Sequence, residues 1–497
     1  MIATASDCSG TARGAEAVVE TVAEPKTMSP GYGAIRGDNT HPRGLPPRVM
    51  CVPTQISDTR DAAASTALLT DQYELTMLSA ALADGSAFRT CSFEVFARRL
   101  PDGRRYGIVA GTERLLDALE HFRFGEPELA IVSKFLDDTT VEWLRNYRFS
   151  GDIDGYREGD FYFPGSPILS VRGSFAECVL LETLALSILN HDSAIASAAA
   201  RMVSAADGRR LIEMGSRRTH EQAAVASSRA AYLAGFDATS NLEAVRRHDV
   251  PGAGTSAHAF TLLHTTDNGT DEAAAFRAQV DVLGVSTTLL VDTYDITEGV
   301  KTAIAVAGTE LGGVRIDSGD LGVVTRQVRR QLDDLGATKT RIVVSGDLDE
   351  YAIAALRAEP VDTYGVGTSL VIGSGAPTAG MVYKLVEVDG IPVEKRSTNK
   401  ASRGGAKKAL RIARQTGTLV EEVIYPADAP SPFTAADGAT ELMIPLVRGG
   451  KTVDGVPTLE ESRAVVKAGL LSLPWEGLKL SRGDSAVPVR FVGGGHR

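Results

Sequence analysis

The strongest constraint on the fold is a repeated pattern between residues 211 and 370, where short apolar runs alternate with segments of helical character. Strands that alternate with helices are joined by right-handed crossovers and therefore form a parallel sheet. A closed barrel and an open, doubly wound sheet both satisfy this pattern. The seven runs are LIEMG at 211–215, GFDATS at 235–240, PGAGTSA at 251–257, TTLLVDT at 287–293, GGVRIDSGD at 312–320, RIVVSGD at 341–347 and VDTYGVGTS at 361–369.

Polar residues at the ends of these runs distinguish between the two architectures. An open sheet concentrates its site at one switch point, whereas a barrel gathers every strand end around one mouth. Because seven ends carry functional chemistry, the sequence favours an α/β barrel, irregular because it has seven runs instead of eight. In chain order the polar ends are Arg217 and Arg218, Thr239 and Ser240, Thr255 and His258, Asp292 and Thr293, Asp317 with Ser318 and Asp320, Ser345 and Asp347, and Gly365 with Gly367.

The sequence predicts further parts on either side of the barrel. Residues 1–66 are rich in Gly, Ala, Pro, Ser and Thr without sustained periodicity, which is typical of a disordered extension. Residues 67–205 mix strand and helix patterns and predict an N-terminal α/β (α+β) domain, which the barrel follows at 206–380. Residues 381–480 alternate less regularly, and we expect them to pack back on the N-terminal domain. We expect residues 481–497 to form a flexible tail.

Composition narrows the class of protein. Lys and Arg total 52 and Asp and Glu total 63, which argues against an extended surface for nucleic acid or anionic membranes but allows a local basic pocket. The four cysteines form no CxxC pair, so a reduced, cytoplasmic protein is expected. No run reaches 18 apolar residues, and the start MIATASDCSG has no signal-peptide pattern, so neither a membrane span nor a signal peptide is expected.

The stretch GVRIDSGDL at 313–321 is the richest in candidate chemistry. Two nearby carboxylates, Asp317 and Asp320, can hold the waters of Mg²⁺ or the hydroxyls of a ribose, and Arg315 can hold a phosphate with two parallel hydrogen bonds. The alternative is purely structural, with Ser318 capping a helix that has acidic residues in its first turn.

Three other strand ends allow both a functional and a structural interpretation. Exposed N–H groups of GVGTSL at 365–370 can cradle a phosphate, or the segment is a plain turn. Asp347 either faces the mouth or caps the following helix. Arg217 and Arg218 either make surface ion pairs or bind an anionic group of a substrate.

His258, in GTSAHAF at 254–260, is the candidate with the most distinctive surroundings. It has no HxH or HxxxH partner and no nearby cysteine, so a metal site is not expected. Small neighbours, including Gly254, Ser256 and Ala257, leave room for a bulky group, as a histidine that accepts a phosphoryl group requires. A buried, hydrogen-bonded histidine is the alternative.

Ten motifs together resemble the nicotinate phosphoribosyltransferase family over roughly residues 67–480. They follow one another in the family's order, which barrel geometry alone does not explain. One departure is STNKASRGGAKKALR at 397–411, where many members have a proline-glycine turn. The motifs are LLTDQYELTM, FEVFARRLP, ETLALSILN, GSRR, SRAAYLAGFDATSN, GTSAHAF, LLVDTYD, VRIDSGDL, GVGT and GMVYKLVE.

The resemblance implies a type II phosphoribosyltransferase, a homodimer of NAD salvage. The implied reaction joins nicotinate to 5-phosphoribosyl 1-pyrophosphate, with Mg²⁺ as cofactor and ATP hydrolysed as co-substrate. Alternatives are a nicotinamide or quinolinate phosphoribosyltransferase, or a non-catalytic barrel that binds nucleotides. A lyase or aldolase barrel would need a Schiff-base lysine or a metal cluster at a strand end, and the runs contain neither.

The resemblance also assigns roles to residues. Gly346 and the loop 365–368 would hold the 5′-phosphate, Tyr73 would stack on the pyridine ring from across the dimer, and Arg218 would meet the carboxylate of nicotinate. His258 matches the family histidine that ATP phosphorylates. The predicted catalytic residues are His258, Asp317 and Asp320, the last two also predicted on the metal side, and the predicted substrate-binding residues are Tyr73, Arg217, Arg218, Ser240, Thr255, Arg315, Ser318, Gly346, Gly365, Gly367 and Thr368.

Overall fold

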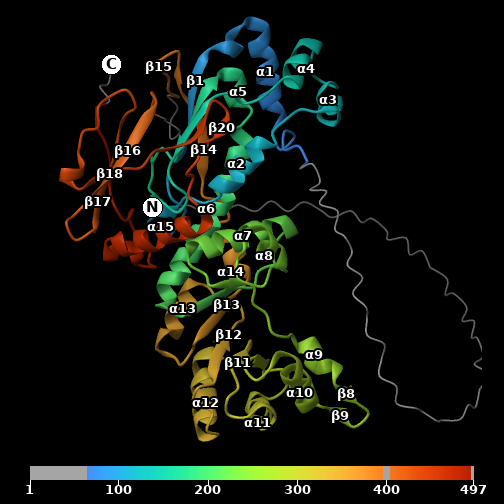
Figure 1. The fold of residues 1–497 in the computed structure, drawn as a ribbon. Coiled ribbons are helices and arrows are strands. Elements are labelled where there is room, and N and C mark those ends of the chain that lie inside the picture. The colour runs from blue at the N-terminus through green and yellow to red at the C-terminus, as the bar shows by residue number, and fades with distance from the viewer. Residues whose placement is uncertain (1–63, 396–402, 494–497) are drawn as a thin grey trace, which may run out of the picture. The chain divides into compact units, whose positions relative to one another are not determined.

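The structure is a computed structural model that describes residues 64–395 and 403–493 (Figure 1). The predicted disordered extension, 1–66, lies outside the described residues except for its last three. Of these, Thr66 donates its backbone N–H to the carbonyl of His121 at 3.1 Å, so the ordered fold includes the end of that segment.

A parallel sheet forms the centre of the 206–380 region. Within the described residues it has six strands, and an isolated parallel bridge between Thr239 and Gly252 adds the PGAGTSA run as a seventh. All seven predicted runs therefore take part in one sheet. In spatial order the strands are β10 (Thr288–Leu290), β11 (Gly313–Ile316), β12 (Arg341–Val344), β13 (Thr363–Val366), β6 (Arg210–Glu213) and β7 (Ala238–Thr239).

The sheet curves as a half barrel and is not closed by backbone pairing. Among the described residues, no backbone hydrogen bond joins the Gly252 run to β10. Side chains span this gap: His258 Nδ1 lies 3.1 Å from Thr293 Oγ1, and Arg315 Nη1 lies 3.5 Å from the carbonyl of Ser256. The predicted irregular α/β barrel is thus confirmed, and its irregularity lies at the edge where His258 stands.

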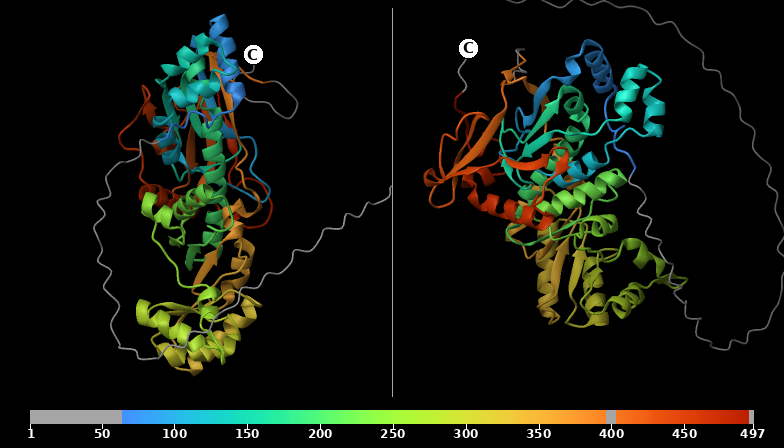
Figure 2. Two further views of the ribbon diagram at one scale, coloured as in Figure 1. Left: turned by 90° about the vertical axis from the view of Figure 1, so that its right-hand side faces the viewer. Right: turned by 45° about the horizontal axis from the view of Figure 1, so that its top comes forward.

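Helices follow the strands of the half barrel, as the alternating pattern predicts, and α10, α11 and α12 lie together (Figures 1 and 2). Buried aliphatic residues of the strands, such as Val314 and Ile342, pack with residues of these helices in one core. The helices are α7 (Glu221–Ala234), α8 (Leu242–His248), α9 (His258–Leu263), α10 (Glu272–Leu283), α11 (Ile296–Ala307), α12 (Leu321–Asp334), α13 (Glu350–Ala355) and α14 (Thr368–Val371).

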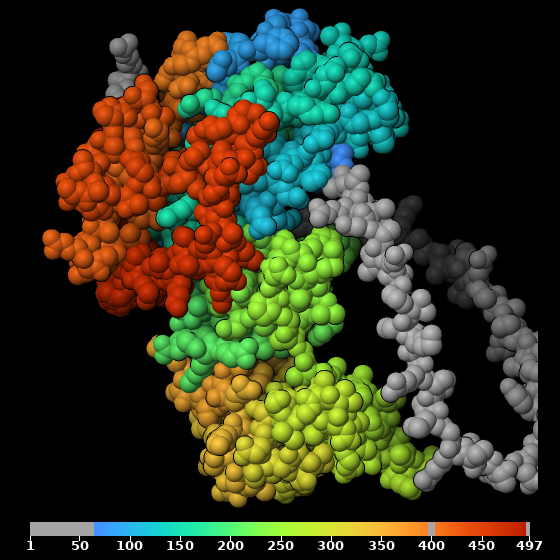
Figure 3. Space-filling model, in the orientation of Figure 1, coloured from blue at the N-terminus to red at the C-terminus, as the bar shows by residue number. Residues whose placement is uncertain are grey.

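An antiparallel sheet combines strands from both ends of the chain. The N-terminal strand β1 lies between β5 and the C-terminal strand β14, and β19 pairs with β3. On the surface, the orange and red atoms of the C-terminal part accordingly lie against the blue and teal atoms of the N-terminal part (Figure 3). This confirms that the C-terminal part packs against the N-terminal domain, while the predicted domain boundaries stay predictions. In order the strands are β15 (Ile391–Pro392), β14 (Met381–Val388), β1 (Thr90–Ala97), β5 (Leu169–Ser174), β3 (Asp152–Gly155), β19 (Ile444–Arg448) and β20 (Lys451–Thr452).

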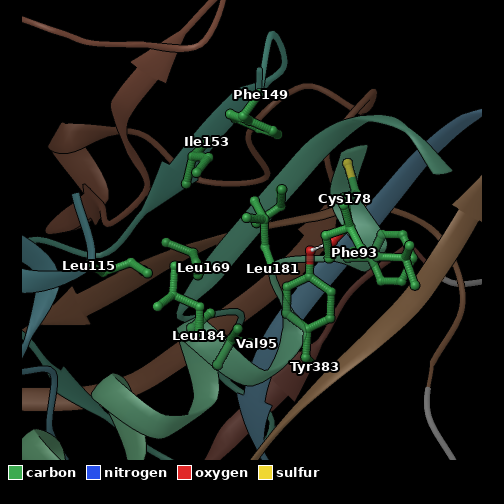
Figure 4. Packing of buried hydrophobic residues seen from close by; sticks show 14 of the residues in the cluster. Phe93, Val95, Leu115, Phe149, Ile153, Leu169, Cys178, Leu181, Leu184 and Tyr383 are labelled. Carbon is green, nitrogen blue, oxygen red and sulfur yellow. Dashed lines mark hydrogen bonds between the residues drawn. The ribbon is translucent and has the colours of Figure 1, made fainter. Parts of the chain in front are cut away.

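The core beneath this sheet is apolar and aromatic. Phe93 of β1 stacks on Tyr383 of β14 with ring centroids 5.0 Å apart, and the Tyr383 hydroxyl donates to the carbonyl of Cys178 at 2.8 Å (Figure 4). The aromatic pair therefore fastens the C-terminal strand to the N-terminal helices. These helices are α1 (Gln72–Asp84), α2 (Thr112–Glu120), α3 (Glu126–Val132), α4 (Asp138–Arg145), α5 (Phe175–Val179) and α6 (Glu182–Ala206).

The helical stretch Phe175–Ala206 is long and apolar enough to cross a membrane by length and composition, but 67% of its most apolar window is buried inside the fold. Its alanines, including Ala196 and Ala199, allow close approach of neighbouring elements and are fully buried. We interpret this stretch as a core helix.

A third sheet contains part of the predicted tail. Within residues 481–497, Val489–Phe491 forms β21 and pairs with β17, and Val487 is buried, so this part is built into the fold rather than flexible. Its alternating apolar residues cover the open edge of β17. The predicted loop 397–411 is described from residue 403, and its end lies in β16. In spatial order the strands are β18 (Ala439–Glu441), β16 (Lys407–Ala413), β17 (Leu419–Pro426) and β21. In the chain, α15 (Leu459–Ser472) lies between β18 and β21.

The remaining strands form two short antiparallel pairs. The first pair lies in the N-terminal region and the second forms a hairpin between α9 and α10. They are β2 (Gly107–Ile108) with β4 (Phe161–Tyr162), and β8 (Thr265–Thr266) with β9 (Gly269–Thr270).

Gly299 allows α11 to lie directly against the end of β10, which gives a test of the barrel packing. A Cβ atom at Gly299 would lie 2.3 Å from the carbonyl oxygen of Val291, whereas at Gly322 of α12 the nearest atom is 3.5 Å away. We predict that Gly299→Ala lowers the free energy of unfolding by about 1–3 kcal/mol. The control Gly322→Ala should raise it by roughly 0.4–1 kcal/mol. Denaturant titrations that rank the two variants the other way would contradict this packing.

Candidate active site

The candidate site lies at the carboxyl ends of the parallel strands, where loops lead from the strands into the helices that follow them. Aspartates cap three of these helices: Asp295 accepts a hydrogen bond from the N–H of Glu298 at 2.9 Å, Asp320 from Val323 at 3.2 Å, and Asp349 from Ala352 at 2.7 Å. The unpaired N–H groups of the first turns therefore gather around the mouth of the half barrel, which favours anionic ligands there.

Arg315, Asp317 and Ser345 form one cluster across β11 and β12. Arg315 Nε donates to Ser345 Oγ at 2.9 Å and Arg315 Nη2 lies 3.4 Å from Asp317 Oδ1, which also accepts the Ser345 hydroxyl. The Arg315 side chain is largely buried and the Asp317 side chain is about one-third exposed. The structure thus brings these two predicted residues together and adds Ser345.

The structural alternative, in which Ser318 caps the helix and Asp320 is only a first-turn acid, is wrong. The cap of α12 is Asp320, not Ser318, because only the Asp320 side chain reaches the first-turn N–H groups. Ser318 instead donates its hydroxyl to Asp292 Oδ2 at 2.7 Å.

Two glycine-rich turns lie beside this cluster. A Cβ at Gly346 would approach the carbonyl oxygen of Asp317 to 2.6 Å, and Gly346 has a φ of 104°, so only glycine suits this position. A Cβ at Gly365 would lie 2.7 Å from the sulfur of Met214. Gly367 precedes α14, which begins at Thr368. Asp347 does not cap α13, since Asp349 does.

His258 lies at the first position of α9 and is partly exposed. Its side chain is 41% accessible, so the alternative of a buried histidine is wrong. Nδ1 lies 3.1 Å from Thr293 Oγ1, and Nε2 lies 3.9 Å from Asp292 Oδ1. The Asp292 side chain is completely buried, and its Oδ1 has no hydrogen bond within the described residues.

Asp292 therefore joins His258 to the Arg315 cluster. Its Oδ2 accepts hydrogen bonds from the N–H of Asp317 at 2.8 Å and from the hydroxyl of Ser318. The sequence marked Asp292 and Thr293 only as a polar strand end, and neither was a candidate site residue. The signal that could have found Asp292 is its place at the end of a strand next to the one that carries Asp317.

Glu272 is a second residue that the sequence did not indicate. Burial, followed by the charges of Asp292 and Asp295, raises the pKa of Glu272 to about 7. Its Oε1 is buried without a hydrogen bond in the described part of the chain. In the sequence it looks like an ordinary first-turn acid of α10.

Glu213, at the end of β6, supports the loop of the predicted arginines. It accepts hydrogen bonds from the N–H of Gly215 and, at 2.5 Å, from Thr239 Oγ1. Burial raises the pKa of Glu213, although these bonds oppose the shift. Arg217 and Arg218 are exposed next to this supported loop and form no ion pair with a described residue. Their role as anion-binding residues stays a prediction.

Three other predicted residues lie at different places. Ser240 and Thr255 are exposed at the ends of the second and third runs. Tyr73 lies on α1, which packs on α4 and α5 of the N-terminal region, so within one chain it does not join the other candidates. It is 46% exposed, and burial of its hydroxyl together with the charge of Glu182 raises its pKa to about 12.

A complete metal site is absent from the described residues, where no three His, Cys, Asp or Glu side chains lie close enough to hold an ion. Asp317 and Asp320 offer two carboxylates. Magnesium commonly takes one or two carboxylates and completes its shell with water and substrate phosphates. Two carboxylates alone do not make a resident metal site, so Mg²⁺ beside Asp317 and Asp320 stays a prediction.

Two family models match the chain. The one described as nicotinate phosphoribosyltransferase N-terminal domain matches residues 68–190, and the one described as nicotinate phosphoribosyltransferase family matches residues 209–416. The chain belongs to the nicotinate phosphoribosyltransferase family. The resemblance found in the sequence is thereby confirmed.

Relatives from bacteria and animals agree with this family. The chain is 66% identical over 428 residues to the nicotinate phosphoribosyltransferase pncB1 of Mycobacterium tuberculosis, covering 86% of this chain and 95% of that one. It is 31% identical over 506 residues to the human nicotinate phosphoribosyltransferase, covering 85% and 94%. The crystal structure of human nicotinic acid phosphoribosyltransferase superposes with a TM-score of 0.72 at 28% identity, covering 85% of this chain and 97% of that chain.

Glu272 gives a prediction about pH and stability. Its pKa in the fold lies above its ordinary value of 4.5, so its ionisation opposes folding. The cost is absent below about pH 4.5, grows as the pH rises from there to about 7, and is constant at higher pH. Glu272→Gln should therefore raise the Tm relative to the unaltered chain at pH 8 and lose this advantage toward pH 5. Calorimetry with the exposed Glu298→Gln as control tests this, and an equal shift at both pH values would refute it.

Proposed function

We propose that this chain transfers the phosphoribosyl group of 5-phosphoribosyl 1-pyrophosphate to nicotinate, forming nicotinate mononucleotide and pyrophosphate for NAD salvage. The observation that carries the proposal is the cluster of Arg315, Asp317 and Ser345 between two glycine-rich strand ends, in a chain of this family. It combines a cation, a carboxylate and free backbone N–H groups, which are the groups that a phosphorylated sugar needs.

The chemistry places different demands on the two sides of the cluster. The bond between ribose C1 and the pyrophosphate oxygen breaks as the pyridine nitrogen forms a bond to C1, so positive charge develops on the sugar and negative charge on the leaving group. Asp317 and Asp320 stabilise the sugar cation, and Arg315 the leaving charge. Mg²⁺, when bound with the substrate, would neutralise part of that charge, and Asp317 and Asp320 would be its nearest carboxylates. Gly346 and residues 365–368 hold the 5′-phosphate by their N–H groups.

Nicotinate recognition depends on the exposed arginines. We assign Arg218 to the carboxylate of nicotinate, because its guanidinium is exposed beside a strand end and forms no ion pair with a described residue. Arg217 lies next to it, and Ser240 and Thr255 are exposed at the ends of neighbouring runs. Tyr73 of a second copy stacks on the pyridine ring in the homodimer we propose.

His258 is the residue that ATP phosphorylates in this proposal. The arrangement supports a phosphohistidine in which Nε2 keeps its proton toward Asp292 and the Thr293 hydroxyl turns away from Nδ1. The lone pair of Nδ1 thus released attacks the γ-phosphorus of ATP, with ADP as leaving group. Water later cleaves the P–N bond and releases phosphate. The enzyme is then of the ATP-dependent ligase type (EC 6.3.4.21), works in the cytoplasm, and couples ATP hydrolysis to turnover without placing the phosphoryl group in the product.

Other functions fit the site less well. A nicotinamide enzyme would leave the Arg218 guanidinium facing a neutral amide, and a quinolinate enzyme would need further cations for a second carboxylate. A non-catalytic nucleotide-binding barrel has no use for a partly exposed histidine with a buried carboxylate behind it.

His258 is the first residue to test. We predict that ATP labelled at the γ-phosphate gives an acid-labile, base-stable label on the protein, and that His258→Ala removes it while a slow ATP-independent transfer survives. His264→Ala, which changes a histidine at the other end of α9, serves as control and should keep the label. A label that persists in His258→Ala would place the phosphohistidine elsewhere.

Arg218 tests substrate recognition. Loss of a charge-assisted hydrogen bond costs about 1.5–3 kcal/mol, or roughly 10- to 150-fold. We predict that Arg218→Ala raises the KM for nicotinate by about that factor and changes the KM for 5-phosphoribosyl 1-pyrophosphate much less. Steady-state kinetics with each substrate varied in turn provide the measurement. Equal effects on both KM values would remove Arg218 from the carboxylate site.

A further inference from the structure

Three charged side chains meet in the interior beneath the two glycine-rich turns. Glu350 Oε1 accepts hydrogen bonds from Arg104 Nη1 at 3.1 Å and from Arg201 Nε at 3.0 Å. The side chains are 1%, 5% and 4% exposed, respectively, so all three are more than nine-tenths buried. We call these three residues the Glu350 cluster.

The Glu350 cluster connects both turns that follow β12 and β13. Glu350 is the first residue of α13, directly after the turn of Gly346. Its Oε2 accepts the hydroxyl of Ser374, and Arg104 Nη2 donates to the carbonyl of Gly373 at 2.6 Å. Residues 373–375 form the short turn after α14, the helix that begins at Thr368. The Glu350 carboxylate thus connects the start of α13, after the turn of Gly346, to the turn that follows α14.

The two arginines of the cluster belong to the N-terminal region, and Arg201 also contacts a C-terminal segment. Arg201 projects from α6 and donates to the carbonyls of Gly103 at 3.0 Å and Leu480 at 3.2 Å. Arg104 lies in the loop between β1 and β2. The two turns are therefore held against elements outside the half barrel.

The backbone of Ser374 shows that this arrangement is imposed on the chain. Its φ and ψ are both 50°, in the left-handed region that a non-glycine residue adopts at some cost. The hydrogen bond to Glu350 offsets that cost. The carboxylate stays ionised, because the Ser374 hydroxyl and the two arginines hold its pKa below the ordinary value despite the opposing effect of burial.

A buried ion cluster is weak support for stability in itself, because desolvation cancels much of the attraction between the charges. Its better-attested use is to select one arrangement among several of similar energy. Two arginines and one glutamate also leave a net positive charge in the interior beneath turns that are proposed to hold a phosphate dianion.

We propose that the Glu350 cluster is a positioning device that fixes the spacing of the turns after β12 and β13 and thereby sets the affinity for the sugar 5′-phosphate. This inference rests on the proposed function. It assigns Arg104, Arg201 and Glu350, together with Ser374, to the binding of 5-phosphoribosyl 1-pyrophosphate, although none of them touches the substrate.

Two mild variants test the cluster without removing a buried charge. Ser374→Ala deletes one hydrogen bond to Glu350, and Arg104→Lys keeps the charge but cannot reach Glu350 and the carbonyl of Gly373 together. We expect the Kd for 5-phosphoribosyl 1-pyrophosphate, measured by calorimetry without nicotinate, to rise roughly fivefold and about tenfold, respectively. The KM for nicotinate should change less than about twofold.

The matched control weakens an equally buried ion pair elsewhere. Glu422 pairs with Arg411 at 2.9 Å in the third sheet, and both side chains are nine-tenths buried or more. Glu422→Gln should lower the Tm and leave the Kd unchanged.

The outcomes separate the two levels of the proposal. If the unaltered chain binds 5-phosphoribosyl 1-pyrophosphate and the two cluster variants bind it equally well, or lose affinity only in proportion to Tm as Glu422→Gln does, the inference is wrong and the proposed function stands. If the unaltered chain neither binds this substrate nor releases pyrophosphate from it, both are wrong.

Discussion

The backbone ladder of the parallel sheet is the constraint on which the rest of the site depends. Parallel pairing brings the carboxyl end of every strand to the same edge, and the pairing of β13 with β6 joins the last run to the first. This places the glycine turn at 365–368 next to Gly215, where a Cβ atom would lie 3.1 Å from the carbonyl oxygen of Gly367, and so beside the loop of Arg217 and Arg218. Residues about 150 positions apart therefore share one mouth.

Most of the fold follows from patterns that are local in the sequence. Seven apolar runs with polar ends predicted an irregular α/β barrel, because strand alternation and helix caps are set by neighbouring residues. The sequence could not show that the ring stays open between the Gly252 run and β10, since closure depends on backbone pairing at long range. It also treated residues 481–497 as a tail, because the pairing of β21 with β17 depends on an edge more than 60 residues away.

Site residues that belong to a sequence motif could be predicted, whereas residues distinguished only by their burial could not. Arg315, Asp317 and the glycines stand in a recognisable order, and the structure brings them together. Asp292 and Glu272 became visible only when their oxygens proved to be buried beside His258 and beside each other's charge. Ser318 and Asp347 look like caps in the sequence, yet Asp320 and Asp349 cap those helices, because two residues of turn precede each first helical N–H.

The most direct test of the central claim is the rate of pyrophosphate release from 5-phosphoribosyl 1-pyrophosphate by the unaltered chain, measured with nicotinate, nicotinamide or quinolinate, each with and without ATP. The proposed function predicts release with nicotinate, faster when ATP is present, and much slower release with the other two acceptors, because only nicotinate places a single carboxylate against Arg218. Equal rates with nicotinamide, or release that requires quinolinate, would contradict it.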